Sequence, residues 1–275
     1  MIMKRFFLVL VLMSSSVFAQ KTVNGLEFSG LKRTKERFLR RLVKVKPNTV
    51  VDTLKIASDV ERLKRLPGIA SASYVLLERD GQTIVKYDVV ENFTIIPGLR
   101  IATANNGDFA FRLSAFEFNF LGNNQLIGGF YSRNVFDSYG FFYEHPFLFS
   151  DKVGLGFSYQ DNTTQEPVFF NAGTKDYRFN SRALEGNVIF SFDFHNEAEV
   201  GASFIKESYD FIGENPIPNT PFSLAADRLS YRAFYRYINI DIDYQYIHGI
   251  NNEFTAQYFT FLEGDEQTET FLGDF

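Results

Sequence analysis

The 275-residue sequence contains no cysteine and no tryptophan, and it has only three histidines. Without cysteine the chain can form neither a disulfide nor a catalytic thiolate, and it cannot carry a lipid-modified N-terminal cysteine. His145, His195 and His248 are far apart and lack the spacing of metal ligands. The sequence also lacks a Gly-x-Ser-x-Gly elbow, a phosphate-binding loop and a Gly-x-Gly-x-x-Gly unit. We therefore expect no catalytic residues, no bound metal and no cofactor, and we do not expect an enzyme.

Long hydrophobic runs are missing as well. The one apolar stretch, 6–13, follows Lys4 and Arg5 and precedes small residues and Val17-Phe18-Ala19. It is much shorter than the roughly 20 residues of a spanning helix, and the pattern is typical of a secretory signal. We predict a signal peptide over 1–19. Any membrane insertion must then be made by strands.

Charge and aromatic residues are unevenly distributed along the rest of the chain. Residues 20–97 hold 15 Lys and Arg against 9 Asp and Glu, whereas residues 98–275 hold 11 against 24. Of the 33 Phe, 27 lie beyond Pro97. This division predicts two domains in different surroundings, 20–93 and 94–275. The basic residues of the first half are spread along helix faces in an exported chain, so we expect no nucleic acid partner.

The first half has the pattern of a small α+β module of order β-α-α-β-β. A short strand over 22–30 precedes a helix with Thr34 as the expected N-cap, and a second helix is expected to begin after Asp52. The second helix should bury the face that carries Leu54, Ala57, Val60 and Leu63. Two strands then form a hairpin around 79–82, where Asp80-Gly81 is the turn signal.

The stretches "GLEFSGLKRT", "DVERLKRLPGIASASY" and "VKYDVVEN" closely resemble a POTRA domain, the periplasmic module of outer-membrane assembly and translocation proteins. The resemblance implies a three-stranded sheet whose edge strand, about 72–79, accepts an extended client polypeptide. An unpaired row of backbone donors and acceptors makes such pairing feasible. The residues expected to pair with a client are Ala72, Tyr74, Leu76 and Glu78. The alternative is that solvent or a neighbouring element merely covers this edge.

The second half alternates between apolar and polar residues with period 2. In "KVGLGFSYQ" (152–160), for example, the odd positions are apolar and the even ones are Lys, Gly, Ser or Gln. An aromatic, continuous apolar face predicts a transmembrane β-barrel with lipid outside and a wet lumen inside. Short turns at 121–124, 148–151, 194–197 and 249–252 alternate with long loops at 161–181 and 213–228. About nine strands are expected: 95–104, 109–120, 125–134, 138–147, 152–160, 181–192, 197–211, 228–248 and 253–263. The pattern changes phase near Ser114 and Tyr237, which indicates either bulges or strand portions outside the membrane.

The stretch "FLGNNQLIGGFYS…YGFFYEHPFLF" (120–149) resembles the early barrel strands of BamA/TamA-like outer-membrane proteins, and we expect it to face lipid. The resemblance implies a non-enzymatic protein of the Gram-negative outer membrane that inserts or translocates other proteins. Its partners would be unfolded outer-membrane or secreted clients, the lipid bilayer and periplasmic accessory proteins. The first barrel strand would form a lateral gate, with Leu99, Ile101 and Thr103 facing lipid. The aromatics expected at the membrane boundary are Phe118, Phe120, Tyr143 and Phe147.

Two features leave alternatives open. The family barrel has more strands and an Arg-Gly-Phe-like motif, whereas no Arg-Gly occurs here and residues 263–275 look like the start of an outer loop. We therefore expect a fragment of a longer product, the alternative being a small barrel of eight or ten strands. A passive structural or adhesive barrel and a dedicated secretion pore are the alternative functions.

Overall fold

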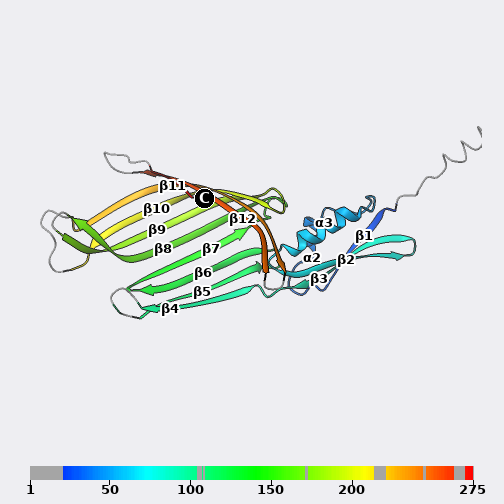
Figure 1. Cartoon of the computed structure of the whole chain (residues 1–275), viewed down its shortest axis with the longest axis horizontal. Coiled ribbons are helices and arrows are strands. Elements are labelled where there is room, and N and C mark those ends of the chain that lie inside the picture. The colour runs from blue at the N-terminus through cyan, green and yellow to red at the C-terminus, as the bar shows by residue number, and fades with distance from the viewer. Residues whose placement is uncertain are drawn as a thin grey trace, which may run out of the picture.

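The computed structural model consists of a small N-terminal α/β domain and a large curved sheet at one end of it (Figure 1). It describes residues 21–103, 107, 109–170, 173–213, 221–243, 246–262 and 270–274. The predicted signal peptide, 1–19, lies outside these residues. In the described part of the chain, no helix is long and apolar enough to cross a membrane.

The N-terminal domain has the predicted element order. Its elements are β1 (Val23–Ser29), α2 (Glu36–Leu42), α3 (Thr53–Lys64), β2 (Ile69–Arg79) and β3 (Gln82–Glu91). The strands form a sheet of order β1-β3-β2, in which β1 runs parallel to β3 and β2 runs antiparallel to it. Asp80 and Gly81 join β2 to β3 with φ of 52° and 73°, the left-handed values that a two-residue hairpin turn requires. The predicted edge strand, β2, does lie at the edge of the sheet.

The helix ends differ in part from the prediction. Asp52 caps α3 as expected, because its carboxylate accepts hydrogen bonds from the backbone N–H groups of Leu54 and Lys55. Thr34 is not the cap of α2; that position belongs to Lys35, which makes no side-chain cap bond. The predicted inner face of α3 was also wrong at Leu54, which is 82% exposed, and at Ala57, which is exposed as well. Ile56 provides the contact with the core instead.

The core of this domain lies between the helices and the sheet. Leu39, Leu42, Ile56 and Leu63 from the helices pack against Val23, Val85 and Tyr87 from the strands. A buried carboxylate, that of Asp59, accepts the backbone N–H groups of Lys44 and Val45 and the hydroxyl of Tyr87. Burial, together with this carboxylate, raises the pKa of Tyr87, which keeps its hydroxyl as a donor.

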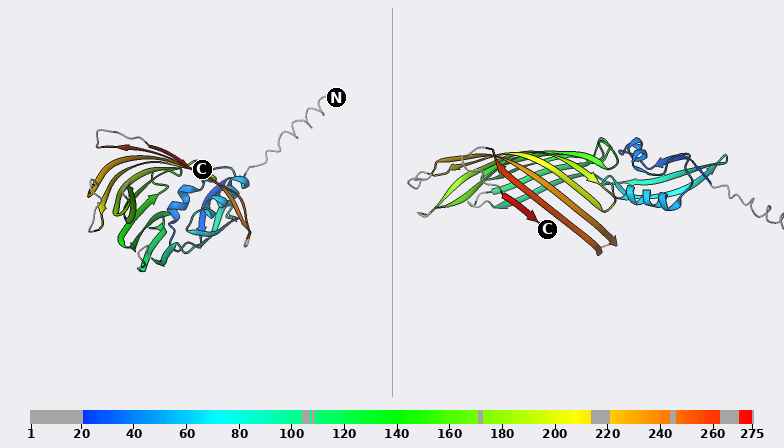
Figure 2. Two further views of the ribbon diagram at one scale, coloured as in Figure 1. Left: turned by 60° about the vertical axis from the view of Figure 1, so that its left-hand side comes forward. Right: turned by 90° about the horizontal axis from the view of Figure 1, so that it is seen from above.

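The large sheet is entirely antiparallel, and its strands follow one another in chain order from β4 to β13. Its strands are β4 (Ile95–Thr103), β5 (Phe109–Phe120), β6 (Gln125–Asn134), β7 (Phe136–His145), β8 (Val153–Phe170), β9 (Gly173–Ser191), β10 (Asn196–Phe211), β11 (Ser223–Asp243), β12 (Tyr246–Phe261) and β13 (Thr270–Asp274). Among the described residues β4 and β13 do not pair, so the sheet is open (Figure 2). The predicted fold, a β-α-α-β-β domain followed by an unclosed antiparallel barrel sheet, is confirmed.

All nine expected strands are present, but several connections differ from the prediction. The expected long loop at 213–228 is shorter, because β11 begins at Ser223. The expected long loop at 161–181 is mostly strand, because β8 and β9 stay paired from Val153↔Phe190 to Phe170↔Gly173. The expected turn at 249–252 lies inside β12, opposite β11. The C-terminal segment, expected to be a loop, includes β13, which pairs with β12 from Thr255 to Phe259.

The two predicted changes of phase have different causes. Pairing of β5 runs without interruption through Ser114, and its register shifts instead between Glu117 and Phe120. No shift occurs near Tyr237, where the β10–β11 ladder ends while the β11–β12 ladder continues to Asp243↔Tyr246. The β11–β12 hairpin therefore projects beyond its neighbour.

Alternate residues separate an outer apolar face from a polar concave face, as predicted. Phe141, Phe157, Leu184 and Tyr231 are exposed on the outer face. Ser158, Gln160, Glu185 and Asn187 line a cavity on the concave face. The prediction that the whole aromatic stretch faces lipid was wrong for Phe130 and Phe142, whose rings pack together on the concave side, 6.2 Å apart, near the cation of Arg112.

Candidate strand-pairing edges and the domain junction

The free edge of β4 presents backbone groups that β5 does not use. The backbone N–H of Phe118 donates to the carbonyl oxygen of Thr94, 3.0 Å away, so these residues form a hydrogen-bonded pair. Hydrogen-bonded and non-hydrogen-bonded pairs alternate along an antiparallel ladder. Continuing the register, the backbone groups of Leu99, Ile101 and Thr103 point away from β5. These are the three residues that sequence reasoning assigned to the gate.

The side chains of this edge are apolar and exposed. Leu99 is 66% and Ile101 60% exposed. Pro97 lies in the same alternating row, where its missing N–H removes no bond to β5. Arg100 and Ala102, in the other row, line a concave pocket with Arg112. The edge thus combines unpaired backbone with an apolar outer surface.

The edge of β2 has a similar arrangement. The backbone N–H of Thr83 on β3 donates to Asn24 Oδ1, 2.8 Å away on the β1 side, and therefore points away from β2. Its partner Glu78 is then in a non-hydrogen-bonded pair, and alternation gives the same orientation to Leu76, Tyr74 and Ala72. All four residues predicted to pair with a client direct their backbone groups toward the free edge.

Their side chains have different surroundings. Ala72 is buried in the core, and Tyr74 packs against the core from its margin. Leu76 is exposed, and Glu78 forms an ion pair with Lys21. Any pairing through this edge would thus rest mainly on the backbone. The predicted residues on β2 and β4 belong to separate sheets, so the structure does not assemble them into one site.

Sequence reasoning missed a junction that fixes the N-terminal domain against the β5–β6 end of the large sheet. The backbone N–H of Lys35 donates to the carbonyl oxygen of Gly122 at 2.9 Å, and Asn119 Nδ2 donates to Thr34 Oγ1 at the same distance. Arg33 forms a 2.6 Å ion pair with Glu117 and donates to Thr94 Oγ1 at 3.1 Å. Backbone, neutral and ionic contacts therefore join the segment before α2 to the end of β5, the β5–β6 turn and the residue before β4.

A second group of contacts joins the helices to later turns of the sheet. The rings of Phe38 and Phe147 lie 5.7 Å apart, and an Arg41 guanidinium nitrogen donates to the carbonyl oxygen of Phe147 at 2.7 Å. Lys44 forms an ion pair with Asp151. Partial burial on its own raises the pKa of Asp151, but Lys44 outweighs it and the pKa lies below its usual value. The prediction that Phe147 faces lipid was therefore wrong.

Arginines of α3 and of its C-terminal end complete the junction. The guanidinium carbons of Arg62 and Arg65 lie 4.7 Å and 5.4 Å from the ring centroid of Phe194, in the turn between β9 and β10. Arg65 also donates to the carbonyl oxygen of Phe194. Cation–π contacts of this kind contribute roughly 0.5–2 kcal/mol each.

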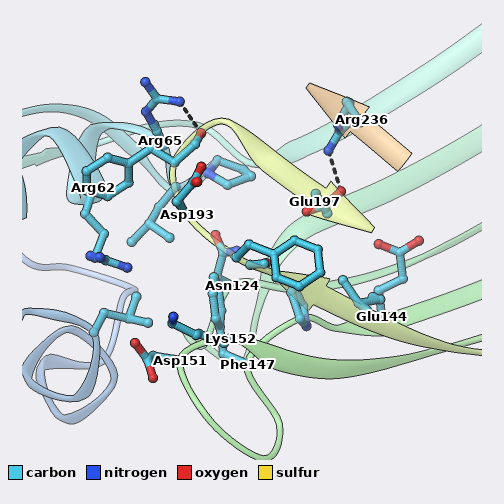
Figure 3. Close-up of a pocket in the computed structure, with 18 of the residues that line it drawn as sticks. Arg62, Arg65, Asn124, Glu144, Phe147, Asp151, Lys152, Asp193, Glu197 and Arg236 are labelled. Carbon is cyan, nitrogen blue, oxygen red and sulfur yellow. Dashed lines mark hydrogen bonds and ion pairs between the residues drawn. The ribbon is translucent and has the colours of Figure 1, made fainter. Parts of the chain in front are cut away.

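A cavity of about 490 Å³ lies between the two parts of the molecule (Figure 3). Arg62, Arg65 and Leu66 line it from the N-terminal domain, while Phe118, Glu144 and Ile189 line it from the sheet. The prediction of a lipid contact was accordingly wrong for Phe118 as well. Deeper on the concave face, Arg232 pairs with Glu185 and Glu199 at 2.7 Å and 3.0 Å, and Arg236 pairs with Glu197 at 2.7 Å.

Comparison with known proteins identifies the first domain. Residues 21–92 match the POTRA family model, described as a surface antigen variable number repeat. This segment is a POTRA domain. No curated protein matches the sequence of the chain.

Solved structures extend the likeness to the sheet. A structure of BamA from Haemophilus ducreyi lacking POTRA domains 1–3 is 18% identical, with a TM-score of 0.61, over 89% of this chain and 49% of that one. CdiB from Escherichia coli is 9% identical, with a TM-score of 0.52, over 88% of this chain and 45% of that one. At these identities the likeness shows the fold, a POTRA domain followed by BamA-type barrel strands. The chain spans about half the length of the structures it matches.

The three histidines remain separate within this fold. His145 lies at the end of β7, His195 in the turn after β9, and His248 in β12. Within the described residues, no group of three or more His, Cys, Asp or Glu side chains is arranged to hold a metal ion. The features that could act on a partner are therefore the strand edges with outward backbone groups, the exposed apolar surface and the ion pairs.

Proposed function

We propose that this protein inserts or translocates other proteins at the Gram-negative outer membrane, with its POTRA domain in the periplasm. The observation that carries the proposal is the edge of β4, where the backbone groups of Leu99, Ile101 and Thr103 have no strand partner among the described residues and lie beside exposed apolar side chains. Hydrocarbon offers no water to satisfy such groups, so an edge at this depth needs a strand partner. An incoming client strand supplies one.

The driving force needs no enzyme or nucleotide. A net backbone hydrogen bond contributes roughly 0.5–1.5 kcal/mol in water, and leaving its groups unsatisfied in lipid costs several kcal/mol. Each client residue that pairs with β4 therefore lowers the free energy of the inserted state. Alternating apolar side chains of the client come to lie on the outer face beside Leu99 and Ile101.

The POTRA edge has a separate part in this proposal. An unfolded client has unpaired strands in the periplasm, and the outward row of β2 from Ala72 to Glu78 can hold one by β-augmentation. The junction at Gly122 and Asn119 then keeps this edge in a set orientation to the sheet. Its task is to hold an extended chain near the barrel.

A second candidate, a secretion pore, is favoured by the charged concave face. The ion pairs of Arg232 and Arg236 would line a water-filled channel. A polypeptide passing through it would contact polar groups, to which its apolar side chains do not bind. In that case the client crosses the lumen and never pairs with β4.

Substitutions at Ile101 test the insertion mechanism. Ile101→Pro removes the outward N–H without removing a bond to β5, as Pro97 already does in the same row, whereas Ile101→Ala shortens only the side chain. The assay follows an unfolded eight-stranded outer-membrane barrel folding into proteoliposomes that contain the full chain. We expect Ile101→Pro to reduce the folding rate at least tenfold and Ile101→Ala less than twofold. Equal rates for both variants and the parent would overturn strand pairing at β4.

Cysteine cross-linking distinguishes the two routes. Because the chain has no cysteine of its own, Leu99→Cys on the edge and Ser158→Cys on the concave face each supply one reactive thiol. A client with a single cysteine should cross-link to position 99 during insertion. Cross-linking at position 158 alone would favour the pore.

A further inference from the structure

The outer face of the large sheet changes from apolar to charged toward the strand ends that lie away from the POTRA domain (Figure 1). On β8 and β9 the outer pair Tyr159↔Leu184 is followed by the outer pair Asp161↔Arg182. Ion pairs between neighbouring strands continue this change across the sheet. We call the residues of these pairs the charged belt: Arg133–Asp137, Asp161–Arg182, Arg178–Asp210 and Lys206–Asp227.

The cations of the charged belt are more accessible than its carboxylates. In each of the four ion pairs the cation is the more exposed side chain. Asp161 is 8% exposed and accepts a hydrogen bond from Asn180 Nδ2 at 2.6 Å, whereas the side chain of Arg182 remains 59% exposed. Although the belt is balanced in formal charge, it therefore presents mainly cations to whatever lies over the sheet.

A hollow of about 360 Å³ lies within this belt. Arg178 and Arg182 line it together with three carboxylates of the belt, and Tyr139, Thr163 and Asn180 add hydroxyl and amide groups. The volume falls in the roughly 300–1,000 Å³ range of ligand pockets. The hollow thus offers both cations and neutral hydrogen-bonding groups beside the apolar outer surface.

The two arginines of the hollow are directed to different sides of β9. Arg182 pairs with Asp161 on β8, whereas Arg178 pairs with Asp210 on β10. Their Cα atoms are four residues apart on one strand, which is about 13 Å at about 3.3 Å per residue. A single phosphate therefore suits only one of the two guanidinium groups. A headgroup that carries two phosphates on a spacer suits both.

The position of the belt restricts the occupant further. With the POTRA domain in the periplasm, the apolar outer surface faces acyl chains, and the belt faces the headgroups of the outer leaflet. Guanidinium groups bind phosphate through paired N–H···O bonds. The exposed carboxylate of Asp137 and the hydroxyl of Tyr139 are suited to the hydroxyl groups of a sugar.

We propose that the charged belt binds a phosphorylated glycolipid of the outer leaflet. One phosphate contacts Arg178 and a second contacts Arg182, while sugar hydroxyls bond to Asp137 and Tyr139. The acyl chains lie along the apolar face beside Leu184. This inference rests on the proposed placement of the chain in the outer membrane and does not depend on client insertion.

Four substitutions test the roles of the cations. Arg178→Gln and Arg182→Gln each remove one cation of the hollow, and Arg182→Lys keeps the positive charge but loses the forked donors. Arg228→Gln is the matched control. Arg228 also forms an ion pair between strands, with Glu207, and it follows Asp227 directly on β11, but the alternation of the strand places it on the concave face.

The measurement is native mass spectrometry of the full chain, released from detergent micelles and titrated with diphosphoryl lipid A, a phosphorylated glucosamine disaccharide with acyl chains. The fraction of chain with one bound lipid gives the Kd. We expect Arg178→Gln and Arg182→Gln each to raise the Kd about tenfold, Arg182→Lys about threefold and Arg228→Gln less than twofold. Monophosphoryl lipid A and phosphatidylglycerol should bind the parent at least tenfold more weakly. Circular dichroism of each variant checks that the strands are kept.

Several outcomes overturn the inference. A Kd that is the same in all variants places the lipid elsewhere on the apolar face. Phosphatidylglycerol that binds as tightly as diphosphoryl lipid A assigns the belt to ordinary anionic phospholipids, and displacement of the lipid by inorganic phosphate assigns the hollow to phosphate alone. Because this assay contains no client, its result is distinct from the Ile101 test: normal client folding with an unchanged Kd in all variants removes the glycolipid site and leaves the proposed function standing.

Discussion

The backbone N–H of Lys35 donates to the carbonyl oxygen of Gly122 across 2.9 Å, joining the start of α2 to the turn between β5 and β6. Neither atom belongs to a side chain, so the bond depends on how closely the two backbones approach. Gly122 permits the approach because it has no Cβ and because its φ is 70°. The orientation of the POTRA domain thus depends on a glycine of the sheet.

Gly122→Ala should release the POTRA domain from the sheet. A Cβ at this position would lie 2.2 Å from the carbonyl oxygen of Arg33, so the two backbones must separate. Gly81→Ala is the matched control: its φ of 73° imposes a similar strain of roughly 1–2 kcal/mol, but a Cβ there meets nothing within 4 Å.

Cross-linking across the junction measures the release. In a background with Lys44→Cys and Asp151→Cys, a short bis-maleimide should join the two domains efficiently. We expect Gly122→Ala to reduce the yield at least threefold and Gly81→Ala to leave it unchanged. Equal yields in the two variants would show that the approach at Gly122 does not set the orientation.

The alternating direction of backbone groups along β2 predicts that proline substitutions at two neighbouring residues have different effects. Leu76 directs its N–H to the free edge, whereas Leu77, opposite Ile84, uses its own N–H in the ladder with β3. Leu76→Pro should therefore slow client insertion while the sheet stays intact. Leu77→Pro should break a ladder bond at a cost of about 1–3 kcal/mol.

Hydrogen exchange separates these two effects. Amides of β3 should exchange at the parental rate in Leu76→Pro and at least tenfold faster in Leu77→Pro. Fast exchange in both variants would mean that the assigned alternation along β2 is incorrect, and normal insertion with Leu76→Pro would remove the role of this edge.

Local pattern predicted those parts of the fold in which neighbouring residues decide the structure. The strands expected at 109–120 and 125–134 coincide with β5 and β6, because polar turns bound an alternating pattern on both sides. The long β8–β9 hairpin was missed because residues such as Thr163, Thr164, Gln165 and Glu166 are polar on both faces. Without an apolar side, a paired strand has the same composition as a loop.

The junction and the cavity required knowledge of contacts between distant residues. Threonine is a common N-cap residue, yet the hydroxyl of Thr34 accepts a hydrogen bond from Asn119, 85 residues later in the chain. Phe118 and Phe147 are aromatic residues of the kind found at a membrane boundary, yet the POTRA domain covers them. The sequence indicates a turn at Gly122, but only the structure shows that the missing side chain of this glycine makes room for the backbone of Arg33.

Protonation of Glu91 should weaken the loop that leads into α2. Its carboxylate accepts the backbone N–H groups of Arg33 at 2.8 Å and Thr34 at 2.7 Å. Partial burial alone raises the pKa of this carboxyl, but the N–H groups of Thr34, Lys32 and Arg33 outweigh it, so the pKa lies below the usual 4.5. A lowered folded-state pKa stabilises the protein above about pH 4.5, and this stability is lost as pH falls through the lowered pKa.

Glu91→Gln should therefore lower the Tm of the POTRA helices at pH 7. The difference in Tm from the parent should shrink as the pH falls through the lowered pKa of Glu91, because the parent carboxyl then also becomes neutral. Circular dichroism at 222 nm of the full chain in detergent follows this transition. Glu61→Gln is the control, because the Glu61 carboxylate contacts the exposed amine of Lys64 at 2.8 Å and accepts no backbone N–H among the described residues. A Tm difference for Glu91→Gln that stays constant with pH would show that the backbone bonds do not depend on the charge of Glu91.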